Sequence, residues 1–420
     1  MRFAYTPEQE ALRREVRDFI AKEVTPEVKA EMEAHNEGHA FTQMMRFALD
    51  KTKAPNLIRL FEKIAERGWV GMSFPKEYGG QGKDRVSQYI VEEELYRANI
   101  SVTLSGSGAP AILAAGTEEQ KRYFVPRLIT GELSFALGFT EPRGGADLAA
   151  LQCRAIPDGD FYVINGQKMY TSYAQFASHI YLMARTNKDA PTHSGISIFL
   201  VPMDTPGITV RPLLSVQNDP PSPQGTTLGH HRTNETFFED VRVHKSTLLG
   251  EANKGWGIGA MALNIDRVGA WRYLITVMRD EDIVNWVKES DGLGGRSPAD
   301  DPAIRDKIAE LWIEAQVCRL MTMRSMSIVE HGGHFTYEGS ADKVWAPEHG
   351  VRTTEAISQM LGAYGQLLNG SPHAISDGVY AHNLMSAYQN GVNHGSVQVM
   401  RDQIATRGLG LPRGGKTKKK

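Results

Sequence analysis

The spacing of apolar residues changes twice along the chain, and this change constrains the fold more than any other sequence feature. Near the N-terminus, Leu12, Val16 and Phe19 recur at the three- and four-residue steps of one helical face. Thr6 followed by Pro7 is typical of a helix start, because threonine caps the first turn and proline fits into it. We therefore expect an N-terminal α-helical domain over residues 1–133.

From about Ser134 the apolar residues form short runs that glycine and proline separate. Such runs are typical of strands, and they fall at residues 180–184, 196–201, 208–210 and 236–243. Asn165-Gly166 lies between two further apolar runs and predicts a β-hairpin, because this dipeptide suits a type I′ turn. We expect a middle antiparallel β-barrel domain over residues 134–250.

The helical spacing returns from about Gly255, where Ile304, Ile308 and Leu311 step by four and three residues. The sequence predicts a C-terminal four-helix bundle over residues 251–413, followed by a basic tail at residues 414–420. The expected fold class is α+β multidomain, since a chain of 420 residues is too long for one ordinary core.

Composition narrows the classes of partner and location. The formal charge of −2 gives no reason to expect nucleic acid, and no apolar run reaches the length of a membrane span. The only cysteines, Cys153 and Cys318, lie far apart without metal-ligand spacing, so we expect a reducing compartment and no metal. The N-terminus has no targeting pattern, and a cytoplasmic location is expected.

Seven short segments occur in a fixed order over nearly the whole chain. They are TEPRGGAD at 140–147, NGQKMYTS at 165–172, FFEDVRV at 237–243, LLGE at 248–251, ALNIDR at 262–267, QMLGAYG at 359–365 and LGLPR at 409–413. In this order they resemble the signatures of the acyl-CoA dehydrogenase family, whose first two read TEPGAGSD and NGxKxWIT(N/S). One match could arise by chance, but seven in register could hardly do so.

The resemblance implies FAD as the cofactor, held by residues that match the family's flavin contacts. These residues are Leu137, Phe139, Thr140, Gly145 and Ala146 near the first signature, Tyr170, Thr171 and Ser172 in the second, and Gln359, Gly362, Gly395 and Ser396 near the C-terminus. Without the resemblance, Thr140 would be a strand-end hydroxyl bonded to its own backbone and Tyr170 a core aromatic. Gln359 and Gly362 would mark a plain helix-end turn.

The implied reaction is α,β-dehydrogenation of an acyl-CoA thioester, in which a carboxylate removes the α-proton and the β-hydride passes to flavin N5. The family places its catalytic glutamate at one of two positions, and here these hold Asp266 and His394. We expect Asp266 to be the base, with a cap carboxylate beside Arg267 as the alternative. His394 is the second candidate base, since imidazole titrates near neutral pH, and its alternative is a structural role.

The resemblance also implies substrate contacts from Ala146, Asp266 and Arg267, where a salt bridge of Arg267 to Asp266 or Asp240 is the alternative. Two flavin contacts are weakened. Ala146 replaces the serine of the family's signature, and Arg296 is the one candidate for the arginine that holds a neighbouring flavin's pyrophosphate. The implied partners are electron-transfer flavoprotein or a similar acceptor and further subunits, in a homotetramer or in a heterotetramer with a second dehydrogenase chain.

Two alternative functions stay open at this point. The missing glutamate also fits a non-catalytic subunit that completes a partner's site. It fits another flavin chemistry on the same fold as well, namely that of an oxidase, a monooxygenase or a desulfinase. The sequence predicts neither the acyl group nor the electron acceptor.

Overall fold

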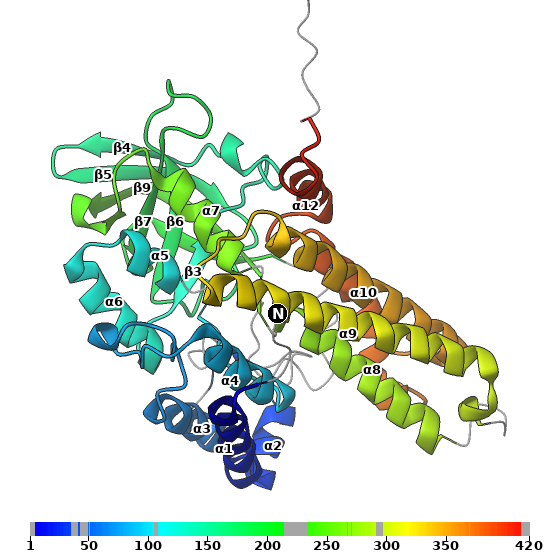
Figure 1. Cartoon of the computed structure of the whole chain (residues 1–420). Helices are drawn as coiled ribbons and strands as arrows, with labels where there is room; N and C mark the ends of the chain where they lie inside the picture. The colour runs from blue at the N-terminus through cyan, green and yellow to red at the C-terminus, as the bar shows by residue number, and fades with distance from the viewer. Residues whose placement is uncertain are drawn as a thin grey trace, which may run out of the picture. The chain divides into compact units, whose positions relative to one another are not determined.

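The computed structural model describes all residues except 1–4, 35–40, 43–48, 50, 105–107, 214–232, 267, 270, 291–296, 369 and 413–420. Arg267, Arg296 and the predicted basic tail therefore lie outside the described residues. The chain forms two compact units (Figure 1). The sheet unit consists of Leu12–Val91 and Ala98–Asp266, and the bundle unit consists of Met1–Ala11, Glu92–Arg97 and Arg267–Lys420.

The predicted N-terminal helices are confirmed, and their caps explain where two of them begin. Before α1 (Pro7–Glu23), Gln9 N donates to Thr6 Oγ1 over 3.2 Å and Thr6 N donates to Gln9 Oε1 over 3.0 Å. Thr117 and Gln120 form the same reciprocal box at the start of α6 (Glu118–Thr130). The other helices here are α2 (Pro26–Ala34), α3 (Pro55–Glu66), α4 (Arg85–Arg97) and α5 (Ala109–Ala115), and a short parallel pair joins β1 (Phe41–Thr42) to β2 (Ile100–Ser101).

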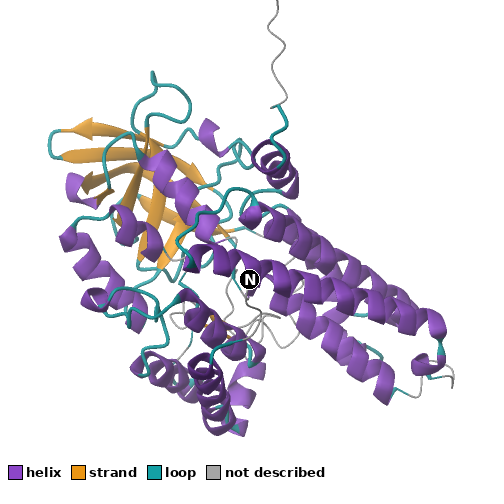
Figure 2. Ribbon diagram, viewed as in Figure 1, coloured by secondary structure: helices purple, strands orange, loops and turns teal. Residues whose placement is uncertain are grey.

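The middle of the chain forms a sheet in which eight strands are described (Figure 2). The strands are β3 (Phe135–Gly138), β4 (Arg154–Asp158), β5 (Phe161–Lys168), β6 (His179–Arg185), β7 (Ile196–Pro202), β8 (Ile208–Pro212), β9 (Asn234–His244) and β10 (Leu248–Leu249). Seven follow the order β10-β7-β6-β4-β5-β9-β8, and β3 pairs with β6. One face buries an apolar core that includes Ile164, Ile180, Leu182 and Phe199.

The predicted middle β domain is confirmed and most of its strand pairs are antiparallel, but the prediction fails at β3 and β4, which both pair with β6 in parallel. Parallel neighbours need a crossover connection, and the chain makes one when it passes through β5 before it reaches β6. The path of described strands has two ends, β10 and β8. Closure into a barrel therefore stays a prediction.

The prediction of a hairpin turn at Asn165-Gly166 was also wrong, because both residues lie inside β5. The turn lies earlier, between β4 and β5, where Gly159 has a φ of 61°. At Asn165 the pairing of β5 with β9 shifts register in a β-bulge. The Asn165 side chain supports the bulge by exchanging two hydrogen bonds of 3.0 Å with Asp240.

In the bundle unit the predicted C-terminal helical domain is confirmed. Its helices are α8 (Trp271–Glu289), α9 (Pro302–Glu330), α10 (Glu338–Leu361), α11 (Val379–Ala387) and α12 (Val397–Gln403), while α7 (Gly255–Asp266) belongs to the sheet unit. α10 packs against each of the other four. Among the described residues, no helix has the length and apolar composition needed to cross a bilayer.

A polar cluster is buried between α8, α9 and α10. His349 is fully buried, with Nδ1 2.9 Å from Glu314 Oε2 and Nε2 3.2 Å from Asp280 Oδ2. Thr353 Oγ1 donates to the other oxygen of Asp280 over 3.1 Å. These bonds join three helices, so they fix the rotation of each helix as well as its distance from the others.

Asp342 on α10 is a second buried carboxyl, and Ser325 Oγ on α9 donates to it over 2.9 Å. Burial raises the pKa of Asp342 to about 7 from its ordinary 3.8, although the Ser325 hydrogen bond and the charge of Arg324 act in the opposite direction. The folded state therefore holds this proton over a pH range in which the unfolded chain has lost it.

We expect Asp342→Asn to stabilise the protein progressively more as the pH rises from about 4 to about 7. Because the pKa of Asp342 is raised in the folded state, the free energy of unfolding of the parent falls through this window by up to about 1.4 kcal/mol per pH unit. Above this window it falls no further. Urea unfolding of both proteins at several pH values measures the difference. Asp306→Asn, which alters an exposed carboxylate on α9, is the control, and a difference independent of pH for Asp342→Asn would contradict the expectation.

Candidate functional site

The first two signature segments lie side by side in the sheet unit. β3 leads into Thr140, β5 ends at Lys168, and Met169 N donates to Thr140 O over 2.8 Å. The contact brings the predicted flavin residues of the first signature next to those of the second. These residues are Leu137, Phe139 and Thr140 on one segment and Tyr170, Thr171 and Ser172 on the other.

A buried ion pair locks the two segments together. Lys168 Nζ donates to Glu141 Oε1 over 2.7 Å and to Phe139 O over 3.1 Å, and the two side chains are 0% and 6% exposed. Glu141 also accepts from the backbone N–H groups of Gln152 and Cys153, over 2.6 and 2.9 Å. The lysine thereby joins both signatures, and the carboxylate joins the first of them to the start of β4.

The first signature itself contains a tight turn. Gly144 N donates to Glu141 O over 3.0 Å, and Gly145 and Ala146 follow as exposed residues. A Cβ on Gly145 would lie 4.0 Å from Thr140 Cγ2, so the loop passes close to the Thr140 side chain. Arg185 anchors the far end of the loop by donating to Ala149 O over 2.5 Å.

Polar groups of both signatures are accessible at this place. Tyr170 is 58% exposed and holds a φ of 57°, Ser172 is exposed as well, and Thr140 is half-buried. Tyr170 is therefore not a core aromatic. The hydroxyls of Thr140 and Ser172 make no hydrogen bond within the part of the chain that the structure describes.

These residues suit a flavin in kind and in placement. An isoalloxazine ring needs neutral donors at its polar edges and an aromatic or apolar surface beside it, and two unbonded hydroxyls and an exposed tyrosine provide them. The Thr171 hydroxyl between Tyr170 and Ser172 is buried and has no partner among the described residues. An unmade bond at a buried hydroxyl such as that of Thr171 costs about 1–3 kcal/mol.

The remaining predicted residues lie elsewhere. Asp266 is the last residue of α7 in the sheet unit, and its side chain lies outside the described part. His394, Gly395 and Ser396 belong to the bundle unit, as do Gln359 and Gly362, which are exposed where α10 ends. Gly362 needs to be glycine, because its φ of 55° with a ψ of −131° is a conformation that side chains exclude.

His394 lies in a loop with an unusual backbone. Its φ is 52°, that of Gly395 is 92°, and the Ser396 hydroxyl caps α12 by accepting from Val399 N. The fully buried Lys343 on α10 holds the loop by donating to Asn390 O and to Asn393 Oδ1. His394 is half-buried, so this loop presents it on a firmly held backbone.

Glu141 and Lys168 had no predicted role, although the sequence contains a signal for Lys168. Ile164, Gly166 and Lys168 alternate along β5, and Ile164 and Lys168 are both buried. A lysine at an inward strand position requires a buried acceptor, and the neighbouring signature contains Glu141.

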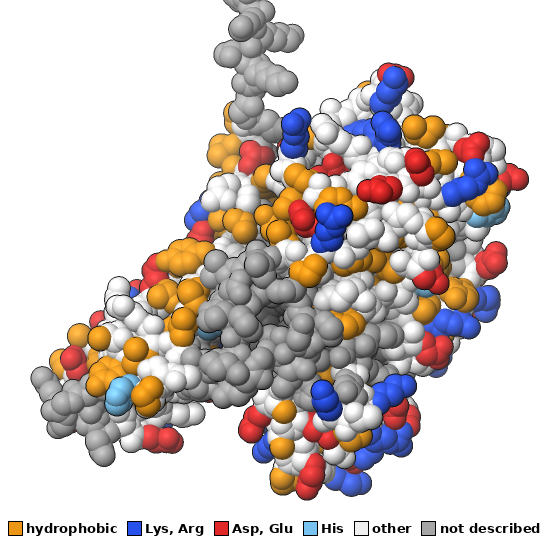
Figure 3. All heavy atoms as spheres, turned by 180° about the vertical axis from the view of Figure 1, so that it is seen from behind, with side chains coloured by type: hydrophobic (Ala, Val, Ile, Leu, Met, Phe, Trp, Pro, Cys, Tyr) orange, Lys and Arg blue, Asp and Glu red, His pale blue; other side chains and the backbone are white. Residues whose placement is uncertain are grey.

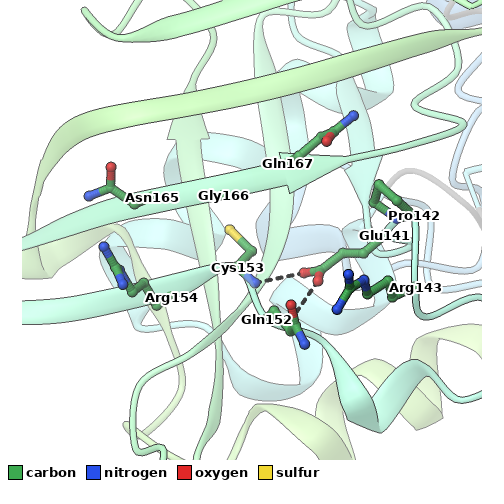
Figure 4. Close-up of a pocket in the computed structure, with 9 residues that line it drawn as sticks. All are labelled: Glu141, Pro142, Arg143, Gln152, Cys153, Arg154, Asn165, Gly166 and Gln167. Atoms are coloured by element: carbon green, nitrogen blue, oxygen red, sulfur yellow. Dashed lines mark hydrogen bonds between the residues drawn. The ribbon is translucent and has the colours of Figure 1, made fainter.

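A hollow adjoins the first signature on the sheet unit. Its volume is about 440 Å³, and its walls are residues 141–143, 152–154 and 165–167. Figure 4 shows Glu141 bonded to the backbone of Gln152 and Cys153 at its centre.

We expect Lys168→Met to destabilise the protein by about 3–5 kcal/mol, because it leaves the Glu141 charge buried without its cation. Lys168→Met with Glu141→Gln should recover part of this loss, because it removes both charges. Denaturant unfolding of the apoprotein measures both effects. Lys245→Met is the matched control, since its 2.7 Å pair with Asp160 is 61% and 67% exposed, and a cost equal to that of Lys168→Met would contradict the prediction.

Comparison with known proteins identifies the family. Three family models match, described as the N-terminal, middle and C-terminal domains of acyl-CoA dehydrogenase, over residues 6–132, 136–241 and 253–409. "Acyl-CoA dehydrogenase FadE26" of Mycobacterium tuberculosis is 32% identical, over 98% of this chain and 99% of that protein.

Two similar solved structures have a TM-score of 0.80, and each comparison covers 99% of this chain and 100% of the other. They are the "ChsE4-ChsE5 complex from Mycobacterium tuberculosis", at 31% identity, and the "Tcur3481-Tcur3483 steroid ACAD", at 30%. The matches together span nearly the whole sequence, and the chain therefore belongs to the acyl-CoA dehydrogenase family of oxidoreductases.

Proposed function

We propose that the chain oxidises the α,β bond of an acyl-CoA thioester, with FAD held on the sheet unit. The proposal rests on the Lys168–Glu141 ion pair and the backbone hydrogen bond between the two signatures. These contacts bring the half-buried Thr140 and the exposed Tyr170 and Ser172 to one place. FAD, when bound, accepts the hydride that leaves the β-carbon. Thr140 and Ser172 donate hydrogen bonds to the cofactor, and Tyr170 packs beside it.

Asp266 removes the α-proton in this proposal. It is the carboxylate at one of the two positions where the family has its base, and it ends α7. The next residue, Arg267, matches the family's contact with the CoA part of the substrate. Aspartate is one methylene shorter than the usual glutamate, which leaves its carboxylate about 1.5 Å farther from the substrate. Desolvation by the bound thioester raises the basicity of such a group and favours proton transfer.

A second function is favoured by the two-chain complexes among the relatives. The solved structures of 30% and 31% identity are named as the pairs Tcur3481-Tcur3483 and ChsE4-ChsE5. A chain without the usual glutamate fits such a pair as the member that completes a partner's site. The first of these pairs is named a "steroid ACAD", which supports a bulky ring-containing acyl group as the substrate class.

We expect Asp266→Asn to retain FAD, seen as an unchanged flavin spectrum, and to slow flavin reduction by acyl-CoA about 100-fold or more. The amide keeps the shape of the side chain and removes the base. Stopped-flow absorbance under anaerobic conditions measures the reduction with a panel of acyl-CoA thioesters.

His394→Ala is the matched comparison, and it should slow reduction far less than Asp266→Asn. The opposite ranking would identify His394 as the base. Reduction of the parent by no acyl-CoA, alone or with a co-expressed second dehydrogenase chain, would reject the dehydrogenase proposal.

We also expect the protein to assemble as a tetramer, made either of four copies of this chain or of this chain with a second, unlike chain. Trp312, Ile313 and Leu320 are exposed on α9, and Figure 3 shows hydrophobic side chains at the surface of the C-terminal helices. Ile313→Glu with Leu320→Glu should dissociate the assembly in light scattering at micromolar concentration, because charges cannot be buried at an apolar interface. Tyr123→Glu, at an exposed aromatic on α6, is the control, and a parent that stays monomeric even with its partner would count against the assembly.

A further inference from the structure

The segment that follows β5 has an unusual backbone. Tyr170 has a φ of 57° and Tyr173 a φ of 54°. Left-handed conformations are uncommon for residues other than glycine, and two of them so close together persist only where the surroundings hold the chain. The segment also contains Ser172, one of the two hydroxyls proposed to contact the cofactor. It therefore needs an anchor, and the placement of the proposed flavin contacts depends on that anchor.

Asn234, the first residue of β9, is such an anchor. Thr171 N donates to the backbone oxygen of Asn234 over 2.9 Å, and Asn234 Nδ2 donates in return to Thr171 O over 3.2 Å. Thr171 is fully buried and Asn234 is 1% exposed, so water does not compete for these bonds. One residue of the strand beside β5 thus holds both backbone groups of Thr171 (Figure 1).

The same amide holds the far side of the turn. Asn234 Nδ2 also donates to Gln175 Oε1 over 2.6 Å, and the turn is closed where Phe176 N donates to Tyr173 O over 3.0 Å. One amide therefore joins the start of the segment to its end. Since a carbonyl oxygen can only accept, the bond to Thr171 O requires the NH₂ group of the amide to point toward the segment.

Strand pairing by itself would place the chain differently. Lys168 pairs with Thr236, so continued antiparallel pairing would set Tyr170 opposite Asn234. Instead Thr171 N donates to Asn234 O, because the left-handed Tyr170 turns the chain out of the strand. Beyond Lys168 the regular ladder has ended, and the bonds from Asn234 hold the chain in its place.

Side-chain packing cannot fix the two proposed flavin contacts of this segment. Tyr170 is 58% exposed, and Ser172 is exposed as well. Between them lies Thr171, the residue that is tied to β9. Its position therefore sets the positions of both neighbours through the backbone.

We propose that Asn234 is a positioning residue for the cofactor, because its amide holds Thr171 and thereby sets Tyr170 and Ser172 where they contact FAD. The inference rests on the FAD site of the proposed function and adds a residue that lies outside the seven signature segments. Asn234 acts through Thr171, since its own side chain is buried.

Asn234→Leu tests the proposal, because leucine has a similar shape and donates no side-chain hydrogen bond. In the flavin-free, full-length protein, hydrogen–deuterium exchange measured by mass spectrometry should become about tenfold faster in residues 170–175. Titration with FAD, followed by flavin fluorescence, should show an affinity about tenfold lower. The absorption bands of the flavin that still binds should shift, because its hydrogen bonds change.

Val243→Ala is the matched control. Val243 is buried on the same strand and pairs with Tyr162 at the other end, so this variant weakens β9 far from Thr171. It should leave the exchange of residues 170–175, the FAD affinity and the flavin spectrum as in the parent. Gln175→Ala removes one acceptor of the Asn234 amide and should change all three in the direction of Asn234→Leu, but less. It decides the test if Asn234→Leu does not fold.

A folded Asn234→Leu variant with the exchange or the FAD affinity of the parent would overturn the proposal. Equal changes in Val243→Ala would also overturn it, because the effect would then be one of general stability. A parent that binds no FAD overturns both this inference and the proposed function. A parent that binds FAD but is reduced by no acyl-CoA contradicts the dehydrogenation alone, since neither exchange nor FAD binding requires turnover.

Discussion

The sheet unit depends on the ion pair between Lys168 and Glu141. Removing two charges from water is costly, and the pair is stable because each charge finds several partners in the protein. Lys168 donates to Glu141 and to Phe139 O, and Glu141 accepts two further backbone bonds. Three chain segments that are distant in sequence are thereby held at one point. The geometry tolerates little movement, since a shift of any segment would leave a buried charge unpaired.

The proposed flavin site follows from this lock. β5 ends at Lys168, and beyond it Tyr170, which has a φ of 57°, and Ser172 are exposed while Thr171 is buried. The Met169–Thr140 hydrogen bond then places the Thr140 hydroxyl beside them. The same ion pair neutralises the charge of Glu141, and Arg143 and Arg154, which line the neighbouring hollow, make no ion pair among the described residues.

The bundle unit uses buried polar groups in a different way. His349, Asp280 and Glu314 fix the relation of three helices, and Lys343 on the central helix holds the loop before His394. The positive φ values of His394 and Gly395 persist in this loop because buried bonds support it. In the proposed function the base is instead Asp266, at the end of α7 in the sheet unit.

Features that depend on neighbouring residues could be predicted from the sequence. Caps at Thr6 and Thr117, the helical apolar steps and the β-rich middle are local patterns, and the structure contains them. The order of the signatures identified the family for the same reason. Asn165-Gly166 is a position where the local pattern predicts the wrong structure. The dipeptide suits a turn in isolation, but it forms a bulge because β9 pairs with β5 and Asp240 bonds to Asn165. The sequence could not predict that Lys168 meets Glu141, or that Arg143 meets no acid among the described residues, because both depend on which distant segments the fold brings together.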